Sequence, residues 1–281
     1  MEYYPSGMST SLPIDIQIAF YRSMFGLEQV EIMRPAYGIE YDYVNPVQLH
    51  ATLETKLIAN LFHAGQINGT SGYEEAAGQG LLAGINAARK VQGRQPLMLG
   101  RHQSYIGVMV DDLVTLGTKE PYRMFTSRAE YRLLLREDNA DIRRRELGHQ
   151  VGLVDEATYA GFCLKREQIQ EELERVRSTR LSLDDSQKGW CERHGCSDLQ
   201  KGTSYEQLLR RPEIGYEQLQ EIDPLVAELP TAVREQVEIQ VKYQGYIERQ
   251  LEQIERMRKQ EEAVIPADMD YRTIPGLTSE V

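Results

Sequence analysis

The sequence of 281 residues predicts an α/β region followed by a mainly helical region. Three short runs of β-compatible residues, at 30–33, 39–44 and 61–64, are bounded by proline, glycine or asparagine. Beyond a glycine-containing stretch at 93–100, apolar residues recur at helical spacing instead. We therefore expect a domain boundary in this stretch, with one domain at 1–96 and a helical domain at 97–281.

Helical periodicity locates four long elements. In the first region, apolar spacing predicts a helix over 14–25, and the stretch that follows Gly72 predicts another to about Val91. In the second region, apolar stripes predict helices over 155–177 and 231–262, the latter being the longest. The polar stretch at 182–203 predicts a loop. The last residues, 274–281, read as a turn and the start of a further helix, which suggests a truncated chain.

Composition points to an ordinary globular protein, with 41% hydrophobic residues and a net charge of -11. No run approaches the roughly 20 apolar residues that a membrane span needs, and no signal peptide is recognisable. Three cysteines are too few for a disulfide framework and suit a reducing compartment, so we expect a cytoplasmic protein. Charge is uneven: residues 89–136 hold nine Lys/Arg against four acids. This basic segment could bind a polyanion locally despite the acidic total.

A glycine-rich turn between a predicted strand and a predicted helix is the main candidate for chemistry. Residues 61–77 read LFHAGQINGTSGYEEAA, with glycines at 65, 69 and 72. Glycine permits unusual dihedrals and a close approach of the backbone to a flat ligand. Free amides at the start of the following helix stabilise negative charge. The spacing is not G-x-G-x-x-G, so a purely structural βα turn remains an equal alternative at this point.

Several long runs resemble the MnmG (GidA) family, whose members modify the wobble uridine of bacterial tRNAs. The run FHAGQINGTSGYEEAAGQG at 62–80 and the run GMSTSLP at 7–13 are similar to the flavin-binding C-terminal motif of that family. The run PYRMFTSRAEYR at 121–132 resembles the start of its helical domain. The similarity covers nearly the whole chain in the same order.

The resemblance implies a homodimeric FAD enzyme that works with the GTPase MnmE. Together they would install a (carboxymethyl)aminomethyl group on C5 of U34 in tRNA, with methylene-tetrahydrofolate as carbon source and NADH as reductant of the flavin. The implied fold is the C-terminal piece of a Rossmann-like FAD-binding domain plus a helical domain. In the turn, Gln66 matches the position at which the family contacts the flavin. The other residues expected to shape this cofactor site are Gly65, Asn68, Gly69, Gly72 and Tyr73.

A basic cluster follows the turn and matches arginines that the family is thought to use for tRNA. If residues 129–135 are helical, three of the arginines lie on one face at i, i+4 and i+8, a spacing suited to phosphates. The alternative is that they pair with neighbouring acids between 120 and 141. The expected tRNA-binding residues are Arg123, Arg128, Arg132 and Arg136.

We expect neither a metal site nor a catalytic residue in this chain. Cys191, His194 and Cys196 have unconvincing zinc spacing, and the proposed catalytic cysteines of the family lie upstream of the residues present here. The chain therefore carries half a flavin site and is expected to be inactive alone. One alternative is a non-catalytic module that binds tRNA or a partner. Another, ranked lower, is a folate- and FAD-dependent tRNA uracil methyltransferase.

Overall fold

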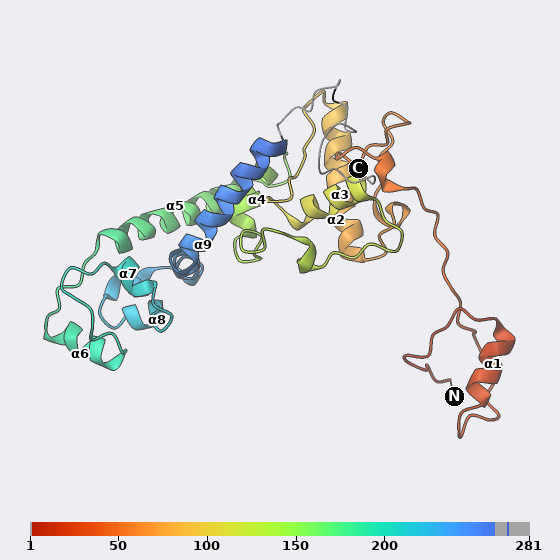
Figure 1. The fold of residues 1–281 in the computed structure, drawn as a ribbon, viewed down its shortest axis with the longest axis horizontal. Coiled ribbons are helices and arrows are strands. Elements are labelled where there is room, and N and C mark those ends of the chain that lie inside the picture. Colours follow the sequence, from red (N-terminus) through yellow and green to blue (C-terminus); the bar gives the residue numbers. More distant parts are fainter. Residues whose placement is uncertain (1, 262–268, 270–281) are drawn as a thin grey trace.

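The computed structural model describes residues 2–261 and 269, and the regular structure of these residues is helical. The molecule is elongated, with a small N-terminal part around α1, a central part around α2 and α3, and a third part that holds α5 to α8 (Figure 1). The α-helices are α1 (Ile14–Arg22), α2 (Tyr73–Val91), α3 (Tyr105–Leu116), α4 (Ala140–Gln150), α5 (Glu156–Ser178), α6 (Asp185–Arg193), α7 (Tyr205–Leu209), α8 (Tyr216–Leu219) and α9 (Thr231–Glu261). Short 3-10 helices span Pro46–Gln48, Gly65–Asn68, Thr126–Arg128 and Pro224–Glu228.

The four predicted helices are confirmed as α1, α2, α5 and α9, with ends that differ by up to three residues. The helix α5 begins where the Asp155 side chain accepts a 2.8 Å hydrogen bond from the backbone amide of Thr158, as an N-cap should. The expected turn and helix start at 274–281, and the final residue of the 231–262 prediction, lie outside the described residues.

The predicted β-runs at 30–33 and 39–44 do not form strands. In the described part of the chain, β-pairing is limited to isolated bridges such as Glu54↔Phe62, which touches the third run, and Thr70↔Tyr122. A strand is stable only when a neighbour satisfies its backbone groups, and among the described residues the run 39–44 has a single such contact, the 2.8 Å hydrogen bond from the Val44 amide to the Ile67 carbonyl. Residues around 37–44 instead form an extended connection between the α1 part and the central part (Figure 1).

The α1 part has little core of its own. Its buried residue on α1 is Gln17, whose amide donates to the carbonyls of Leu12 (2.6 Å) and Ala36 (2.8 Å) and accepts from the amide of Ala36 (2.9 Å). Apolar side chains of α1 such as Ile14 and Phe20 stay exposed. Polar backbone contacts therefore hold this part together.

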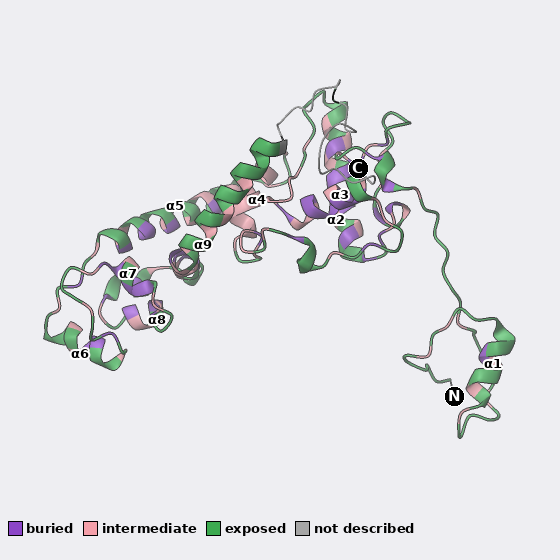
Figure 2. Ribbon diagram, in the orientation of Figure 1, coloured by how far each residue is buried: buried purple, intermediate pink, exposed green. Residues whose placement is uncertain are grey.

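The largest core lies among α5 to α9 (Figure 2). Its centre is Trp190 of α6, which has no exposed surface and donates a 2.9 Å hydrogen bond to the carbonyl of Gln218. The loop predicted for 182–203 is therefore wrong for residues 185–193, because α6 forms here with Asp184 as its N-cap, whereas residues 194–203 form turns as predicted. The first half of α9 contributes Val237 to this core, whereas Leu251 in its second half is 52% exposed.

A second core joins α2 to α3 and to the segment before α2. Leu53, Leu82 and Val110 pack together in it. The turn predicted to hold a cofactor lies directly against this core. No helix of the described chain is both long and apolar enough to cross a membrane.

Candidate cofactor turn and arginine segment

The turn before α2 is held from beneath by one buried side chain, Gln79. Its Oε1 accepts hydrogen bonds from the backbone amide of Gly65 (3.0 Å) and from Nδ2 of Asn68 (2.8 Å). Its Nε2 donates to Oγ1 of Thr70 (2.8 Å), which in turn donates to the carbonyl of Gly65 (2.8 Å). Because Gln79 is fully buried, these bonds fix the path of the turn at both its ends.

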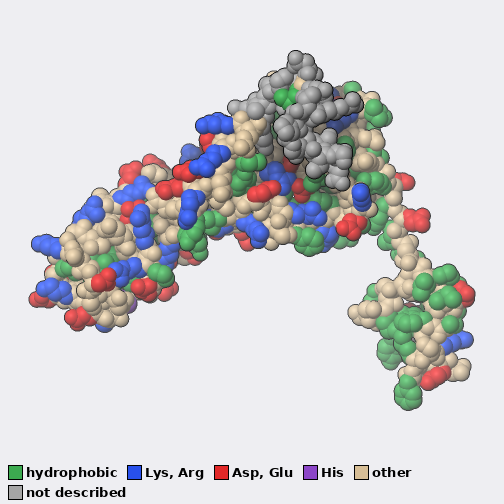
Figure 3. Space-filling model, in the orientation of Figure 1, with side chains coloured by type: hydrophobic (Ala, Val, Ile, Leu, Met, Phe, Trp, Pro, Cys, Tyr) green, Lys and Arg blue, Asp and Glu red, His purple; other side chains and the backbone are tan. Residues whose placement is uncertain are grey.

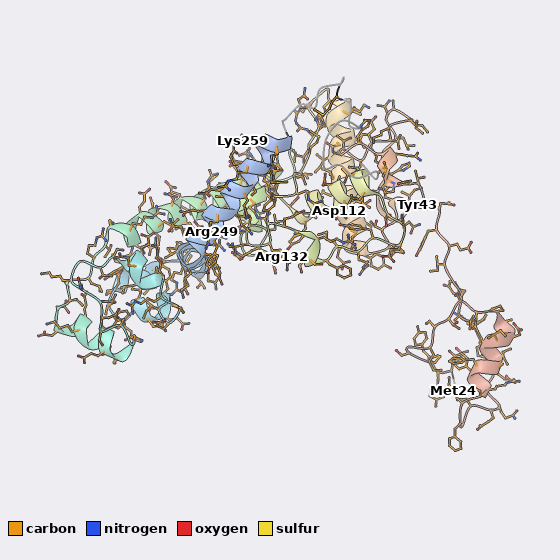
Figure 4. All side chains as sticks on the ribbon, in the orientation of Figure 1. Met24, Tyr43, Asp112, Arg132, Arg249 and Lys259 are labelled. Atoms are coloured by element: carbon orange, nitrogen blue, oxygen red, sulfur yellow. The ribbon has the colours of Figure 1, made fainter. Side chains whose placement is uncertain are left out.

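A cavity of about 270 Å³ opens on the outer side of this turn. Its volume lies near the lower end of the roughly 300–1,000 Å³ typical of ligand pockets. It therefore suits one planar ring system better than a whole dinucleotide. Tyr43 comes from the extended connection, where that segment reaches the central part (Figure 4), and its hydroxyl donates to the carbonyl of Thr118 (2.8 Å). The lining residues are Tyr41, Tyr43, Gln66, Gly69, Thr70, Ser71, Thr118, Lys119, Glu120 and Pro121.

The six residues predicted for the cofactor occupy different positions around the turn. Gln66 is exposed and, with Gly69, lines the cavity. Gly65 and Asn68 are buried behind it and are bonded to Gln79. Tyr73 is 90% exposed and is not part of the cavity wall. Gly72, the sixth, is buried at the start of α2.

Position 72 has no room for a side chain, because the side chains of two other residues fill the space beside it. A Cβ at this position would be 1.8 Å from Oε2 of Glu75 and 2.3 Å from Nη1 of Arg123. The backbone dihedrals of Gly72 are ordinary extended values, so the constraint is space rather than conformation. The absence of a side chain at Gly72 therefore allows α2 to pack against the segment that holds the predicted arginines, residues 123–136, called the arginine segment below.

The turn and the arginine segment are joined by backbone and side-chain contacts. The amide of Tyr122 donates a 2.7 Å hydrogen bond to the carbonyl of Gly69. Oε1 of Glu75 accepts a 2.8 Å hydrogen bond from the amide of Met124, and Oε2 lies 3.9 Å from Nη1 of Arg123. Burial opposes the charge on Glu75, but the amides of Met124 and Glu75 and the guanidinium of Arg123 outweigh it and lower the pKa of the carboxyl. Glu75 is thus a buried, ionised link between the two elements.

A second network fixes the same segment against α3. Oδ1 and Oδ2 of Asp112 accept hydrogen bonds from Nη1 of Arg101 (2.6 Å) and from the Tyr122 hydroxyl (2.8 Å). Burial and the nearby Asp112 carboxylate both raise the pKa of Tyr122. The guanidinium of Arg128 lies 4.4 Å from the centroid of the Tyr122 ring, as in a cation–π contact. The packing of this segment is therefore set by charged groups on three elements.

The four predicted tRNA-binding arginines do not form a ladder on one helix face. Residues 129–139 form turns, and the next helix, α4, begins only at Ala140. Arg136 forms an ion pair with Asp138, in which Nε lies 2.9 Å from Oδ1. The guanidinium of Arg128 packs on the ring of Tyr122. Arg132 is exposed and lies between the central part and the helical part (Figure 4), and the side chain of Arg123 is 51% exposed.

Comparison with known proteins places this geometry in a family. Residues 1–95 match the family described as "Glucose inhibited division protein A", and residues 156–251 match the "tRNA modifying enzyme MnmG/GidA C-terminal helical domain". Over the whole chain, the sequence is 69% identical to a protein of Pelobacter propionicus named tRNA uridine 5-carboxymethylaminomethyl modification enzyme MnmG. A protein of the same name from Geobacter sulfurreducens is 67% identical. The chain belongs to the MnmG (GidA) family.

The structure agrees with this assignment. Crystal form II of Aquifex aeolicus GidA superposes on 99% of the chain with a TM-score of 0.74 and 46% sequence identity. The chain spans 45% of the length of the Pelobacter MnmG and 44% of the GidA chain in the crystal. The resemblance drawn from the sequence motifs is confirmed.

The residues around the turn are compatible with the flavin expected from the sequence resemblance. The two tyrosine rings provide flat apolar walls, Gln66 offers an exposed amide, and Lys119 brings a positive charge to the same cavity. At Gly69, with φ of +79°, a Cβ would approach Cγ2 of Thr118 to 2.6 Å. Only glycine fits this wall of the cavity without displacing it.

The three cysteines lie away from this turn. Cys191 and Cys196 are buried in the core around Trp190, and Cys163 is on α5. In the part of the chain that the structure describes, no group of three or more metal-type side chains is close enough to hold a metal ion. His194 packs at the edge of Trp190 and lies 3.0 Å from a carboxylate oxygen of Glu221.

Several side chains at this site were not singled out from the sequence. Gln79 and Tyr43 carry no distinctive sequence signal, because a glutamine within a helix and a tyrosine in an apparent strand are unremarkable in isolation. Glu75 stands in the first turn of a helix, where an acid is common. No sequence feature signals its burial or links it to Met124.

Proposed function

We propose that this chain carries the flavin-contacting turn and part of the RNA-binding surface of a tRNA-modifying enzyme. The enzyme would use FAD to install a (carboxymethyl)aminomethyl group on C5 of the wobble uridine U34. The observation that carries this proposal is the cavity lined by Gln66, Gly69 and Tyr43, directly beside a segment rich in arginine. Its relatives are named as uridine-modifying enzymes, which supports the same reading.

Gln66 would contact the flavin ring, with Gly69 and Tyr43 closing the cavity around it. Bound flavin would supply the redox chemistry of the reaction. The backbone turn and the positive N-terminal end of α2 would favour negative charge near the ring, because helix amides and the helix dipole stabilise anions. Gly65, Asn68 and Gly72 would shape the turn without touching the ring, since they are buried behind it.

The wider scheme is proposed by analogy with the family. The enzyme would act as a cytoplasmic homodimer with the GTPase MnmE, and would take NADH and methylene-tetrahydrofolate as co-substrates. Residues 1–96 would complete a Rossmann-like FAD-binding domain, and residues 97–281 would form the domain that docks tRNA and partners. The catalytic cysteines would come from outside this chain, which would therefore be inactive alone.

A chimera tests the cofactor part of the proposal. The 281 residues match the Pelobacter MnmG without loss of coverage, so they can replace the matching 45% of that protein. We expect the purified chimera to hold flavin, measured by visible absorbance, and to modify U34, measured by mass spectrometry of digested tRNA. A Gln66→Ala chimera should keep its melting temperature but lose flavin on dilution.

Gln92 offers a matched control, because it is an exposed glutamine at the C-terminal end of α2, far from the cavity. Gln92→Ala should hold flavin as the unchanged chimera does. If Gln66→Ala and Gln92→Ala retain equal flavin, Gln66 is not a flavin contact. If the unchanged chimera binds tRNA but neither holds flavin nor modifies U34, the non-catalytic module is the better description of this chain.

A further inference from the structure

Arginines outnumber acids in the segment from Arg123 to Arg145, and most of its acids are already paired. The segment holds seven arginines and four acids. Glu130 is bound to Arg101, Asp138 to Arg136 and Asp141 to Lys165. Among the residues that the structure describes, four of these arginines have no carboxylate within 4.0 Å. They are Arg132, Arg143, Arg144 and Arg145.

Two of these arginines converge on a single backbone oxygen. Nη1 of Arg143 donates a 2.7 Å hydrogen bond to the carbonyl of Gln103, and Nη2 of Arg144 donates to the same atom. Arg143 is further held by Oδ1 of Asn139 (2.7 Å) and by the carbonyl of Arg136 (3.0 Å). The doublet at the start of α4 is therefore rigidly placed by neutral acceptors rather than by acids.

The charge of this doublet is poorly compensated. Burial and the neighbouring Arg143 lower the pKa of Arg144 to about 10. Burial and Arg136 lower the pKa of Arg143, against a smaller opposing effect of Asp138. In addition, Nε of Arg144 is buried without a hydrogen-bond partner among the described residues. A partly desolvated cation without a counter-ion is costly, and an anion placed beside it removes that cost.

The chemistry of the side chain identifies the anion. Guanidinium groups in a fixed position bind phosphate by paired, charge-assisted hydrogen bonds and are preferred in nucleic-acid recognition. Lys and Arg side chains are also spread over the middle of the molecule, along α9 and toward the central part, with acids among them (Figure 3). Arg136, by contrast, has its charge occupied by Asp138.

We propose that Arg143 and Arg144 form a phosphate-binding site for the backbone of the RNA substrate, with the exposed Arg132 as a further phosphate contact on the segment before α4. The site rests on the proposed function, since it extends the RNA-binding surface of the same enzyme. This site places the main RNA contact at the start of α4, instead of on the helical ladder of arginines that the sequence spacing had suggested. Arg144 supplies a partly buried charge without a carboxylate partner among the described residues, and Arg132, which is exposed, supplies a more accessible one.

The test measures RNA affinity as a function of salt with the 281-residue chain. The probe is a fluorescent 17-nucleotide RNA hairpin with the sequence of a tRNA anticodon stem-loop. Arg144→Gln keeps an amide that can donate to Gln103 but removes the charge. We expect about three- to tenfold weaker binding, and a slope of log affinity against log salt that is smaller by about 0.7–0.9, as for one lost phosphate contact.

Arg193→Gln is the matched control, because Arg193 lies on α6, is 62% exposed and pairs with Glu221. Its affinity and salt slope should equal those of the unchanged chain. Arg132→Gln is the second variant, because its exposed side chain has no described contact whose loss could unfold the protein. It should reduce the salt slope by a similar amount, and circular dichroism melting should be unchanged.

The outcomes separate the site from the function on which it rests. If the unchanged chain binds RNA and both variants bind it with the same affinity and slope, the phosphate site is refuted. Polyglutamate is a second probe. If Arg144→Gln weakens binding of the chain to polyglutamate but leaves its binding to RNA unchanged, the phosphate site is also refuted, because the doublet would then bind an acidic protein. Failure of the unchanged chain to bind RNA would overturn the RNA-binding part of the proposed function, whereas the chimera tests its flavin part separately.

Discussion

Glu75 in the first turn of α2 accepts a 2.8 Å hydrogen bond from the backbone amide of Met124, 49 residues further along the chain. This contact joins the helix that follows the cofactor turn to the segment that carries the arginines. Because the carboxylate is buried and faces Arg123, it couples the position of one candidate surface to that of the other. A ligand that displaces either element must act on this link.

Glu75→Ala should lower the free energy of unfolding by about 1.5–3 kcal/mol, the usual loss for a hydrogen bond to a charged group. Glu74→Ala is the matched control, since Glu74 is exposed on the same helical turn and its removal should change stability by less than about 0.5 kcal/mol. Urea unfolding at neutral pH measures both. Equal effects would mean that the Met124 contact contributes nothing to stability.

The contribution of Glu75 should also depend on pH. Its pKa is lower in the folded protein, so the stabilisation is fully present above the ordinary glutamate pKa of about 4.3 and is lost as pH falls through the folded value. The difference in unfolding free energy between the unchanged chain and Glu75→Gln should therefore shrink as the pH falls from 6 to below 4. A difference that is constant over this range would contradict the charged state assigned to Glu75.

Gly72→Ala and Gly80→Ala should change stability in opposite directions. A Cβ at Gly72 would collide with the Glu75 and Arg123 side chains, and we expect a loss of about 1–3 kcal/mol. At Gly80, in the middle of α2, a Cβ meets nothing within 4 Å, so alanine should stabilise the helix by up to about 1 kcal/mol.

A double-mutant cycle identifies the atoms responsible for the Gly72 effect. If the new methyl group acts by displacing the Glu75 carboxylate, Gly72→Ala combined with Glu75→Ala should cost little more than the larger single loss. Additive losses would show that the methyl group acts independently of Glu75, through its collision with the Arg123 side chain. Thermal unfolding followed by circular dichroism is sufficient for the unchanged chain and its three variants.

Local patterns in the sequence predicted much of the fold and only part of the site. The long helices α2, α5 and α9 were found because their apolar periodicity matches the faces that they bury. α6 was missed because it buries little apolar surface apart from Trp190, so its polar composition resembled a loop.

Residues 129–135 illustrate how packing overrides helix propensity. Ala129 and Leu135 are both buried in one cluster with Val108. At about 100° per residue, a helix would place the two side chains roughly 120° apart, so it could not bury both in the same place. The turns found in the structure achieve this, and they remove the arginine ladder that the spacing had suggested. The link between Glu75 and Met124 is similarly a product of tertiary structure.

Gln79→Leu should cost more than any substitution on the outer face of the turn. It leaves the amide of Gly65 and the side chain of Asn68 buried without an acceptor, and Thr70 without a donor, at about 1–3 kcal/mol for each group that water cannot reach. We expect a loss of at least about 3 kcal/mol, whereas Gln66→Leu should leave stability nearly unchanged. Comparable losses for both glutamines would refute the supporting role of Gln79.

The reactivity of the cysteines should follow their burial. Burial and the neighbouring Cys191 thiol raise the pKa of Cys196 to about 11, so at pH 8 only about one thiol in a thousand is ionised. Cys163 is partly exposed on α5 and lies outside this core. In the native chain, iodoacetamide at pH 8 should therefore label Cys163 first, with Cys191 and Cys196 labelled only after unfolding in urea, as mass spectrometry of tryptic peptides can measure. Early labelling of Cys196 would mean that the core around Trp190 opens far more readily than its packing indicates.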